Sequence, residues 1–333
     1  MYRWVELTPP AFQALASLNP NLTSLRLDFC GRLDDTSISH WSRSLPSLTR
    51  LELLGPFLVR SEAWQKFFKA RKGKSLEGFL ITQSPRFDLA CLEALAQNSG
   101  GKNGRLRELR LKEVGQVSDD FLEVIKRFEN LESLDLGDPS VSISEEAAID
   151  LLSNVGPTLK HLDLSGHREL TDRLLLEGIR FHTGNLEGLT LRGLGEALTD
   201  EGVASFFDTW STNPPLQTLD LSRNPTLSTH SFQALLNHSS SGLRGLNVNG
   251  WSSTSEEALK LLGKKAKALE KVDIGWCRNV DNWVVKDVVN GCEGLKEMKV
   301  WGCNRLTADC PKKVRSSKLR FALCGLVLNT CGS

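Results

Sequence analysis

Histidine and cysteine are the residues of this sequence that could ligate a metal ion or form a nucleophile with its base. The six histidines are spread along the chain, and His161 and His167 are the closest two. No two of the eight cysteines form a Cys-x-x-Cys pair, and the His-Glu-x-x-His and Walker motifs are absent. We therefore expect no catalytic residue, no metal site and no bound cofactor.

Other side chains are better suited to recognition than to catalysis. Four carboxylates recur inside Leu-Asp-Leu or Val-Asp-Ile triplets, at Asp135, Asp163, Asp220 and Asp273. Alternation of apolar and polar residues is typical of a strand with one buried face, which turns the carboxylate toward solvent. Trp276 and Trp301 are further candidates, because tryptophan buries a large area at binding hot spots. These six residues are our candidate partner-binding residues.

A sequence repeat positions all six candidates. The hexad Leu-x-x-Leu-x-Leu, or a close apolar variant, recurs at intervals of 25 to 30 residues. It begins at Leu22, Leu48, Leu76, Leu106, Leu131, Leu159, Leu186, Leu216, Leu243, Leu269 and Leu295. A mean interval of about 27 residues lies within the range of leucine-rich repeats. Each hexad therefore predicts one short strand whose apolar residues point inward.

A helix is expected after each strand. An apolar landmark such as Val117 or Leu170 follows the hexad, and the adjoining pairs Ser118-Asp119, Thr171-Asp172 and Thr199-Asp200 are typical of helix caps. Each unit can bury its apolar face only against its neighbours. The sequence therefore predicts an α/β fold, a curved leucine-rich-repeat solenoid with parallel strands inside, helices outside and about eleven to twelve repeats.

The spacing also predicts the domain limits. We place the leucine-rich-repeat domain at residues 1–311, with a truncated first repeat, because Leu7 has the post-strand spacing but almost no strand precedes it. Residues 312–333 form a basic and then apolar tail. A disordered segment and a degenerate capping strand are both open for this tail.

The fifth hexad position faces solvent and is acidic or neutral from the fifth repeat to the tenth. We expect this central concave face to bind a basic protein segment, because its carboxylates would repel duplex DNA. The alternative is that aspartate is simply common at this position. Of Trp251, Trp276 and Trp301, we expect Trp301 to be the most exposed and Trp251 the most buried, and packing on neighbouring repeats is the alternative to binding.

The cysteines have a structural interpretation. Cys30, Cys277 and Cys303 each lie eight residues after a hexad start, where other repeats carry residues such as His167 or Trp251. Buried free cysteine behaves as a small apolar residue. We therefore predict core thiols rather than redox or metal-binding groups.

Charge is unevenly distributed along the chain. The net charge of +1 divides into +6 for residues 1–115, −13 for 116–258 and +8 for 259–333. Two helix-side basic clusters, at 66–74 and 260–267, predict solvated faces, with contact to DNA or an acidic partner at the basic ends as the alternative. There is no apolar stretch of about 18 residues and no signal-peptide pattern, so we expect no membrane association and a nuclear or cytoplasmic location.

Two segments carry a family resemblance: Asn19–Gly31 (NPNLTSLRLDFCG) and Val300–Pro311 (VWGCNRLTADCP). With them the chain resembles, from about Leu7 to Pro311, the fungal leucine-rich-repeat subunit of the global-genome nucleotide excision repair factor. The middle of the chain fits any cysteine-containing leucine-rich-repeat protein, including F-box receptors. The family's long polar N-terminal region is not in this sequence.

The resemblance implies a non-enzymatic adaptor in damage recognition. Its implied partners are a Snf2-type ATPase on chromatin and an elongin–cullin ubiquitin ligase, and its implied location is the nucleus. The alternative is an F-box-type substrate receptor of a ubiquitin ligase without a DNA role. An F-box would need about 40 residues of helical sequence before the repeats, which this sequence does not contain.

Overall fold

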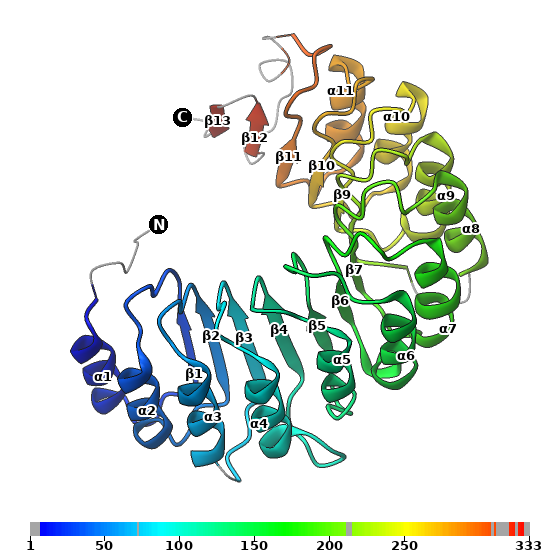
Figure 1. Ribbon diagram of the computed structural model, residues 1–333. Helices are drawn as coiled ribbons and strands as arrows, with labels where there is room; N and C mark the ends of the chain where they lie inside the picture. Colours follow the sequence, from blue (N-terminus) through cyan, green and yellow to red (C-terminus); the bar gives the residue numbers. More distant parts are fainter. Residues whose placement is uncertain are drawn as a thin grey trace. The chain divides into compact units, whose positions relative to one another are not determined.

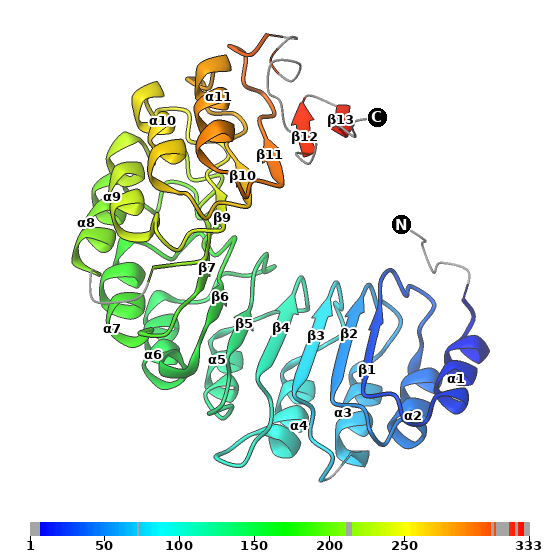
Figure 2. The same cartoon turned by 180° about the vertical axis from the view of Figure 1, so that it is seen from behind.

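The computed structural model describes residues 7–71, 73–210, 215–307, 310, 320–323 and 326–329. It forms two compact units, Met1–His167 and Arg168–Ser333. In each unit, strands lie on one side and helices on the other (Figures 1 and 2). The prediction of one repeat domain over residues 1–311 remains a prediction.

In the first unit, β1 to β6 pair in parallel and in sequence order. Its elements are α1 (Pro9–Leu18), β1 (Ser24–Leu27), α2 (Asp35–Ser44), β2 (Arg50–Leu54), α3 (Ser61–Ala70), β3 (Gly78–Thr82), α4 (Leu89–Ser99), β4 (Glu108–Lys112), α5 (Asp119–Ile125), β5 (Ser133–Asp135), α6 (Glu145–Val155), the 3-10 helix η2 (Gly156–Thr158) and β6 (His161–Asp163).

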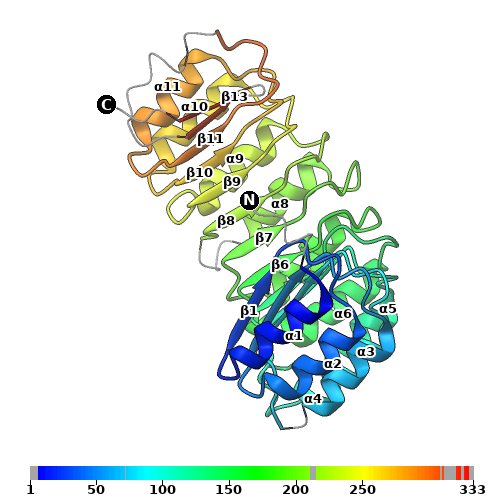
Figure 3. The same ribbon diagram turned by 90° about the vertical axis from the view of Figure 1, so that its left-hand side faces the viewer.

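In the second unit, β7 to β12 are parallel in sequence order, and β13 is antiparallel to β12. Its elements are the π-helix η3 (Leu174–Ile179), α7 (Arg180–His182), β7 (Gly188–Thr190), α8 (Asp200–Thr209), β8 (Thr218–Asp220), α9 (Thr229–Ser239), β9 (Gly245–Asn247), α10 (Glu256–Lys265), β10 (Lys271–Asp273), α11 (Asn282–Gly291), β11 (Glu297–Lys299), β12 (Arg320–Leu323) and β13 (Leu326–Asn329). Figure 3 shows β9, β10 and β11 side by side.

The predicted repeat architecture is confirmed. Each of β1 to β11 lies on one of the hexads, and the apolar hexad residues form the core between sheet and helices. Leu131, Leu134 and Leu136 of one hexad, for example, are at most 1% exposed. Of the predicted tail, 312–319 lies outside the described residues, whereas β12 continues the parallel pairing beside β11.

Every hexad is followed by a residue with a left-handed backbone, seven positions after the hexad start. Five of these residues are glycines, and the other six are larger residues whose φ lies between 49° and 60°. The larger residues are Phe29, Gln83, Glu113, Asp138, Arg223 and Trp276, and the glycines are Gly55, Gly166, Gly193, Gly250 and Gly302. We call this set the left-handed column. The chain leaves each strand through it.

The next position of most repeats is buried in the core, and in several repeats its side chain joins the preceding repeat. His167, Asn224, Trp251 and Cys277 each lie within hydrogen-bonding distance of a carbonyl oxygen at the end of the preceding hexad, on Leu136, Leu191, Leu221 and Val248. The predicted core thiols are confirmed, because Cys30, Cys277 and Cys303 are buried and free. Burial raises the pKa of the Cys277 thiol to about 12 and that of Cys303 to about 11.

The predicted helix-capping pairs link repeats, and Thr199 also caps its own helix, whereas Ser118 stands at the N-cap of α5 without a side-chain hydrogen bond to it. Thr199 accepts a hydrogen bond from the Gly202 amide of its own helix, at 3.0 Å, as expected. Asp172 instead accepts from the Thr199 amide of the next repeat, at 2.9 Å. Asp200 likewise accepts from the Ser228 amide at 2.7 Å. The second residue of the pair therefore holds the start of the following helix, which spacing along one repeat could not indicate.

One residue of the predicted solvated clusters is buried instead. Arg71 is 1% exposed, and its guanidinium donates to the carbonyl oxygens of Leu45, at 2.8 Å, and of Leu48. Burial lowers the pKa of Arg71 to about 10. These carbonyls follow the end of α2, where helix carbonyls lack intrahelical partners, so Arg71 serves packing rather than surface charge.

Within the described residues, no helix combines the length and the apolar character that crossing a bilayer requires.

Candidate partner-binding surface

The open face of the first unit's sheet carries ion pairs that span two repeats. Arg50 of β2 pairs with Glu108 of β4, and Arg110 of β4 lies 3.3 Å from Glu52 of β2. Both pairs cross β3, which lies between these strands. They explain why Leu80, at a hexad position that we expected to face solvent, is only 5% exposed. The arginines of this face are thus largely neutralised within the unit.

All four candidate aspartates hold the chain where it leaves the strand. In each, the Oδ1 atom accepts a hydrogen bond from the backbone amide two residues further along the chain. Asp135 also accepts from Arg110 Nε at 2.8 Å. Burial, followed by the nearby charge of Asp135, raises the pKa of Asp163. The carboxylates therefore have a structural role, whether or not a partner contacts them.

The two candidate aspartates of the second unit also bridge strands. Asp220 accepts from the side-chain amide of Asn247 at 2.8 Å, and Asp273 accepts from that of Asn249 at 3.0 Å. They line a shallow groove of about 190 Å³ on the sheet, together with Lys271 and other residues of β8 to β11. This part of the face is mixed in charge, since lysines stand beside the aspartates.

The tryptophans differ from our expectation in order of exposure. Trp251 is fully buried, as predicted, and its indole Nε1 donates to the core carbonyl described above. Trp276 is 62% exposed and Trp301 only 37%, so the prediction that Trp301 is the most exposed is wrong. The left-handed backbone at Trp276 turns its side chain outward, which counting from the hexad could not show.

Three lysines of the basic cluster at 260–267 contact neighbouring groups of the chain. Lys260 pairs with Glu256 at 2.6 Å, Lys267 donates to the Gly263 carbonyl at 2.6 Å, and Lys265 donates to Asn237. Only the pair with Glu256 neutralises a lysine, whereas the other two contacts orient charged side chains without cancelling their charge. Contact with DNA at the basic ends remains a prediction.

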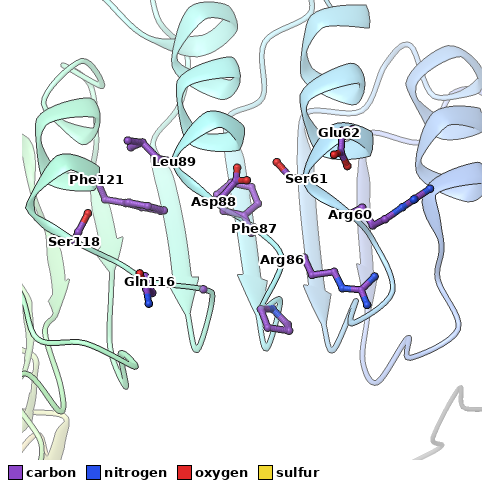
Figure 4. A pocket seen from close by; sticks show the side chains of 12 residues that line it. Arg60, Ser61, Glu62, Arg86, Phe87, Asp88, Leu89, Gln116, Ser118 and Phe121 are labelled. Carbon is purple, nitrogen blue, oxygen red and sulfur yellow. The ribbon is translucent and has the colours of Figure 1, made fainter.

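A larger pocket, not predicted from the sequence, lies where the loops of the first unit enter α3, α4 and α5 (Figure 4). Its volume is about 640 Å³, and its lining includes Arg60, Arg86, Asp88 and Phe121. Arg60 pairs with Asp35 at 2.5 Å. Burial alone would raise the pKa of Asp88, but hydrogen bonds, among them one from the Cys91 amide, lower it overall. Arg60 therefore joins neighbouring helices through Asp35, and Asp88 caps α4.

Among the described residues, no group of three His, Cys, Asp or Glu side chains is placed to hold a metal ion. Parallel strands on repeated hexads, each followed by a helix on the same side, define the chain as a leucine-rich-repeat protein. No family model matches the chain.

Two curated relatives match over 307 residues. The DNA repair protein rhp7 of Schizosaccharomyces pombe is 31% identical, over 92% of this chain and 54% of the relative. The DNA repair protein RAD7 of Saccharomyces cerevisiae is 29% identical, over 89% of this chain and 52% of the relative. The chain is a homologue of these proteins, as the sequence resemblance predicts, and spans about half of their length.

Solved structures agree with this result. A crystal structure of the yeast Rad7 and Elc1 complex matches with a TM-score of 0.83 and 28% identity, over 94% of this chain and 77% of that one. An internalin from Listeria monocytogenes matches with a TM-score of 0.51 and 14% identity, over 97% of this chain and 90% of that one. The internalin shows the shared fold alone.

Proposed function

We propose that this chain is a non-enzymatic interaction adaptor in nucleotide excision repair. In this role it contributes to damage recognition and recruits substrate to a cullin-type ubiquitin ligase through an elongin-type protein. The observation that carries the proposal is the similarity to a yeast Rad7 that was crystallised with Elc1. The homology to two DNA repair proteins supports the repair process and a nuclear location.

The architecture supports an adaptor. Stacked repeats present side chains from several strands and loops over a wide surface, which suits binding to another macromolecule. On this surface we propose Asp135, Asp163, Asp220 and Asp273 as contacts for a basic protein segment. We further propose a Snf2-type ATPase as a second partner, and DNA contact, where it occurs, at the basic ends.

Co-expression with an Elc1-type protein tests the proposal. A 1:1 complex on size-exclusion chromatography, with a dissociation constant measured by calorimetry, is the expected result. An unrelated leucine-rich-repeat domain of similar length is the control. If neither this chain nor the longer natural protein binds the Elc1-type protein, the ligase role is wrong. If only the longer protein binds, the contact lies outside these repeats.

Affinity purification from nuclei tests the process. A co-purifying Snf2-type ATPase supports the repair adaptor. An F-box linker protein in its place would favour a receptor without a DNA role.

A further inference from the structure

Trp276 occupies the left-handed column, where a large side chain is sterically unfavourable. Its φ is 57°, a backbone conformation that suits glycine and that a bulky residue rarely adopts. Burial does not offset this cost, because the side chain is 62% exposed. An exposed indole on an unfavourable backbone points to a role other than folding.

The neighbouring positions of the column on both sides of Trp276 are glycines, so no side chain at these positions covers the indole. In the second unit the column runs Gly193, Arg223, Gly250, Trp276 and Gly302, so that large residues and glycines alternate. The indole lies against Gly302: a Cβ atom built there would be 2.4 Å from its Cδ2 atom. The backbone amide of Trp276 donates to the carbonyl oxygen of Trp301 at 2.5 Å. The two tryptophans are therefore held next to one another.

Two exposed arginines lie on the loops that follow β8 and β10. Arg223 shares the column, and Arg278 follows Trp276 by two residues. Within the part of the chain that the structure describes, no carboxylate forms an ion pair with either guanidinium. Most arginines of the first unit's sheet are paired, as are Asp220 and Asp273 with neighbouring amides. The positive charge of Arg223 and Arg278 is thus available to a ligand.

We propose that Arg223, Trp276, Arg278 and Trp301, here named the rim patch, bind an acidic segment of a partner protein. An apolar side chain of the segment packs on Trp276, and its carboxylates pair with the two guanidiniums, which offer bidentate hydrogen bonds. Tryptophan and arginine are the residues most enriched at protein hot spots.

The dimensions suit a short extended segment. The patch extends over three repeat steps, and neighbouring parallel strands lie about 4.8 Å apart, which gives a span of roughly 14 Å. An extended peptide of about four or five residues covers that distance. A protein segment fits better than a nucleic acid, because Asp220 and Asp273 end the strands directly before these loops. A peptide can place its carboxylates at the two guanidiniums and uncharged residues beside the aspartates, whereas a nucleic acid carries a charge at every phosphate.

The inference rests on the proposed adaptor role only in requiring that the chain bind protein. The probe is a phage-displayed library of random nine-residue peptides, panned against the whole chain. We expect selected peptides to be enriched in Asp or Glu together with an apolar residue. One such peptide, labelled with fluorescein, then serves for affinity measurements by fluorescence polarisation, beside a counterpart with Asn or Gln in place of its acids.

Three variants locate the site. Trp276→Gly installs the residue that several repeats already have in this column, so its denaturation midpoint should be unchanged or higher. We expect it to weaken peptide binding by about tenfold or more, and Arg223→Ala/Arg278→Ala to have an effect of similar size. The matched control is Trp283→Ala on α11, since Trp283 is 61% exposed and lies outside the rim patch. It should change affinity by less than about twofold.

Several results would overturn the inference. These are absence of acidic enrichment, selection of Lys- or Arg-rich peptides, an equal loss in the Trp283 control, or preferential binding of a twelve-residue oligothymidylate to the patch. Binding of an Elc1-type protein, measured on the same variants, separates the two proposals. If it persists while acidic peptides fail to bind, the adaptor role stands and the rim patch does not.

Discussion

The indole Nε1 atom of Trp251 donates a hydrogen bond to the backbone carbonyl oxygen of Leu221 at 2.9 Å, across the boundary between two repeats. Both residues are buried, at 0% and 1% exposure. His167 and Asn224 occupy the equivalent position in their own repeats and also lie at hydrogen-bonding distance from a carbonyl oxygen of the preceding repeat. At this one position of the repeat, side chains of different chemistry thus form hydrogen bonds to the preceding repeat.

Trp251→Phe should therefore destabilise the chain. The change removes one of two donors to the Leu221 carbonyl, which keeps the hydrogen bond from Asn224 Nδ2 at 3.0 Å, and it removes part of a packed indole. Together these losses should lower the free energy of unfolding by about 1–3 kcal/mol. Urea denaturation followed by circular dichroism measures the loss. The same change at exposed Trp283 is the control and should cost less than about 0.5 kcal/mol. Equal losses at both positions would contradict the role of the bond.

His167 should make stability depend on pH. Burial lowers its pKa to about 4, from the ordinary 6.5. The folded chain then binds fewer protons than the unfolded chain between these values, so stability is complete above pH 6.5 and falls as the pH drops toward 4. The shift corresponds to about 3 kcal/mol. Denaturation midpoints measured from pH 7 to pH 4 test this.

His167→Asn is the matched control for that titration. Asn224 donates to the Leu191 carbonyl and accepts from the Leu194 amide, both at 2.9 Å, as His167 bridges a carbonyl and the Ile143 amide. Asparagine cannot titrate, so the variant should lose this part of the pH dependence. An unchanged pH profile would place its origin in other groups.

Gly202 should be intolerant of alanine for a reason outside its own helix. A Cβ atom there would lie 2.0 Å from the carboxyl carbon of Asp172, which caps the same helix. Gly202→Ala should cost about 1–3 kcal/mol through overpacking, despite the better helix propensity of alanine. In a double-mutant cycle, Asp172→Ala should relieve most of that cost. Additive losses would show that the contact is not the cause.

The aspartates of the open face can be tested without disturbing the turns. Asparagine retains the Oδ1 acceptor. Asn247, which occupies the same hexad position as these aspartates, already accepts the Asn249 amide with its Oδ1 atom at 3.1 Å. The variant Asp135→Asn/Asp163→Asn/Asp220→Asn should keep these turns and fold. It loses the second carboxylate oxygen that accepts from Arg110 at Asp135 and from the Asn247 amide at Asp220, which should cost about 1 kcal/mol at each position. It should bind a labelled lysine-rich peptide about three- to tenfold more weakly, mostly through the association rate. A weakened affinity for duplex DNA would contradict the proposed protein contact.

The periodic part of the fold could be predicted from the sequence. The hexads locate β1 to β11, and the position eight residues after each hexad start locates Cys277 and Cys303 in the core. Both depend on spacing within a repeat, which the sequence displays directly. Trp251 is buried for the same reason.

What the sequence did not indicate depends on contacts between repeats. Arg71 is buried because Leu45 and Leu48 present carbonyls to it from the preceding repeat. Leu80 is covered by ion pairs that join the strands on either side of β3. Trp276 is exposed because its backbone is left-handed, and the residues of that column share no composition that spacing alone could detect.

The left-handed column also makes mutation asymmetric. At these positions, replacing a larger residue by glycine relieves about 1 kcal/mol or more of backbone strain, whereas the reverse change introduces it. Selection for stability alone would therefore favour glycine along the column. A tryptophan that stays there, as at Trp276, has to be retained by something other than stability. In a family of such chains, the side chains that persist in this column would mark the surface under selection, while the backbone beneath them stays the same.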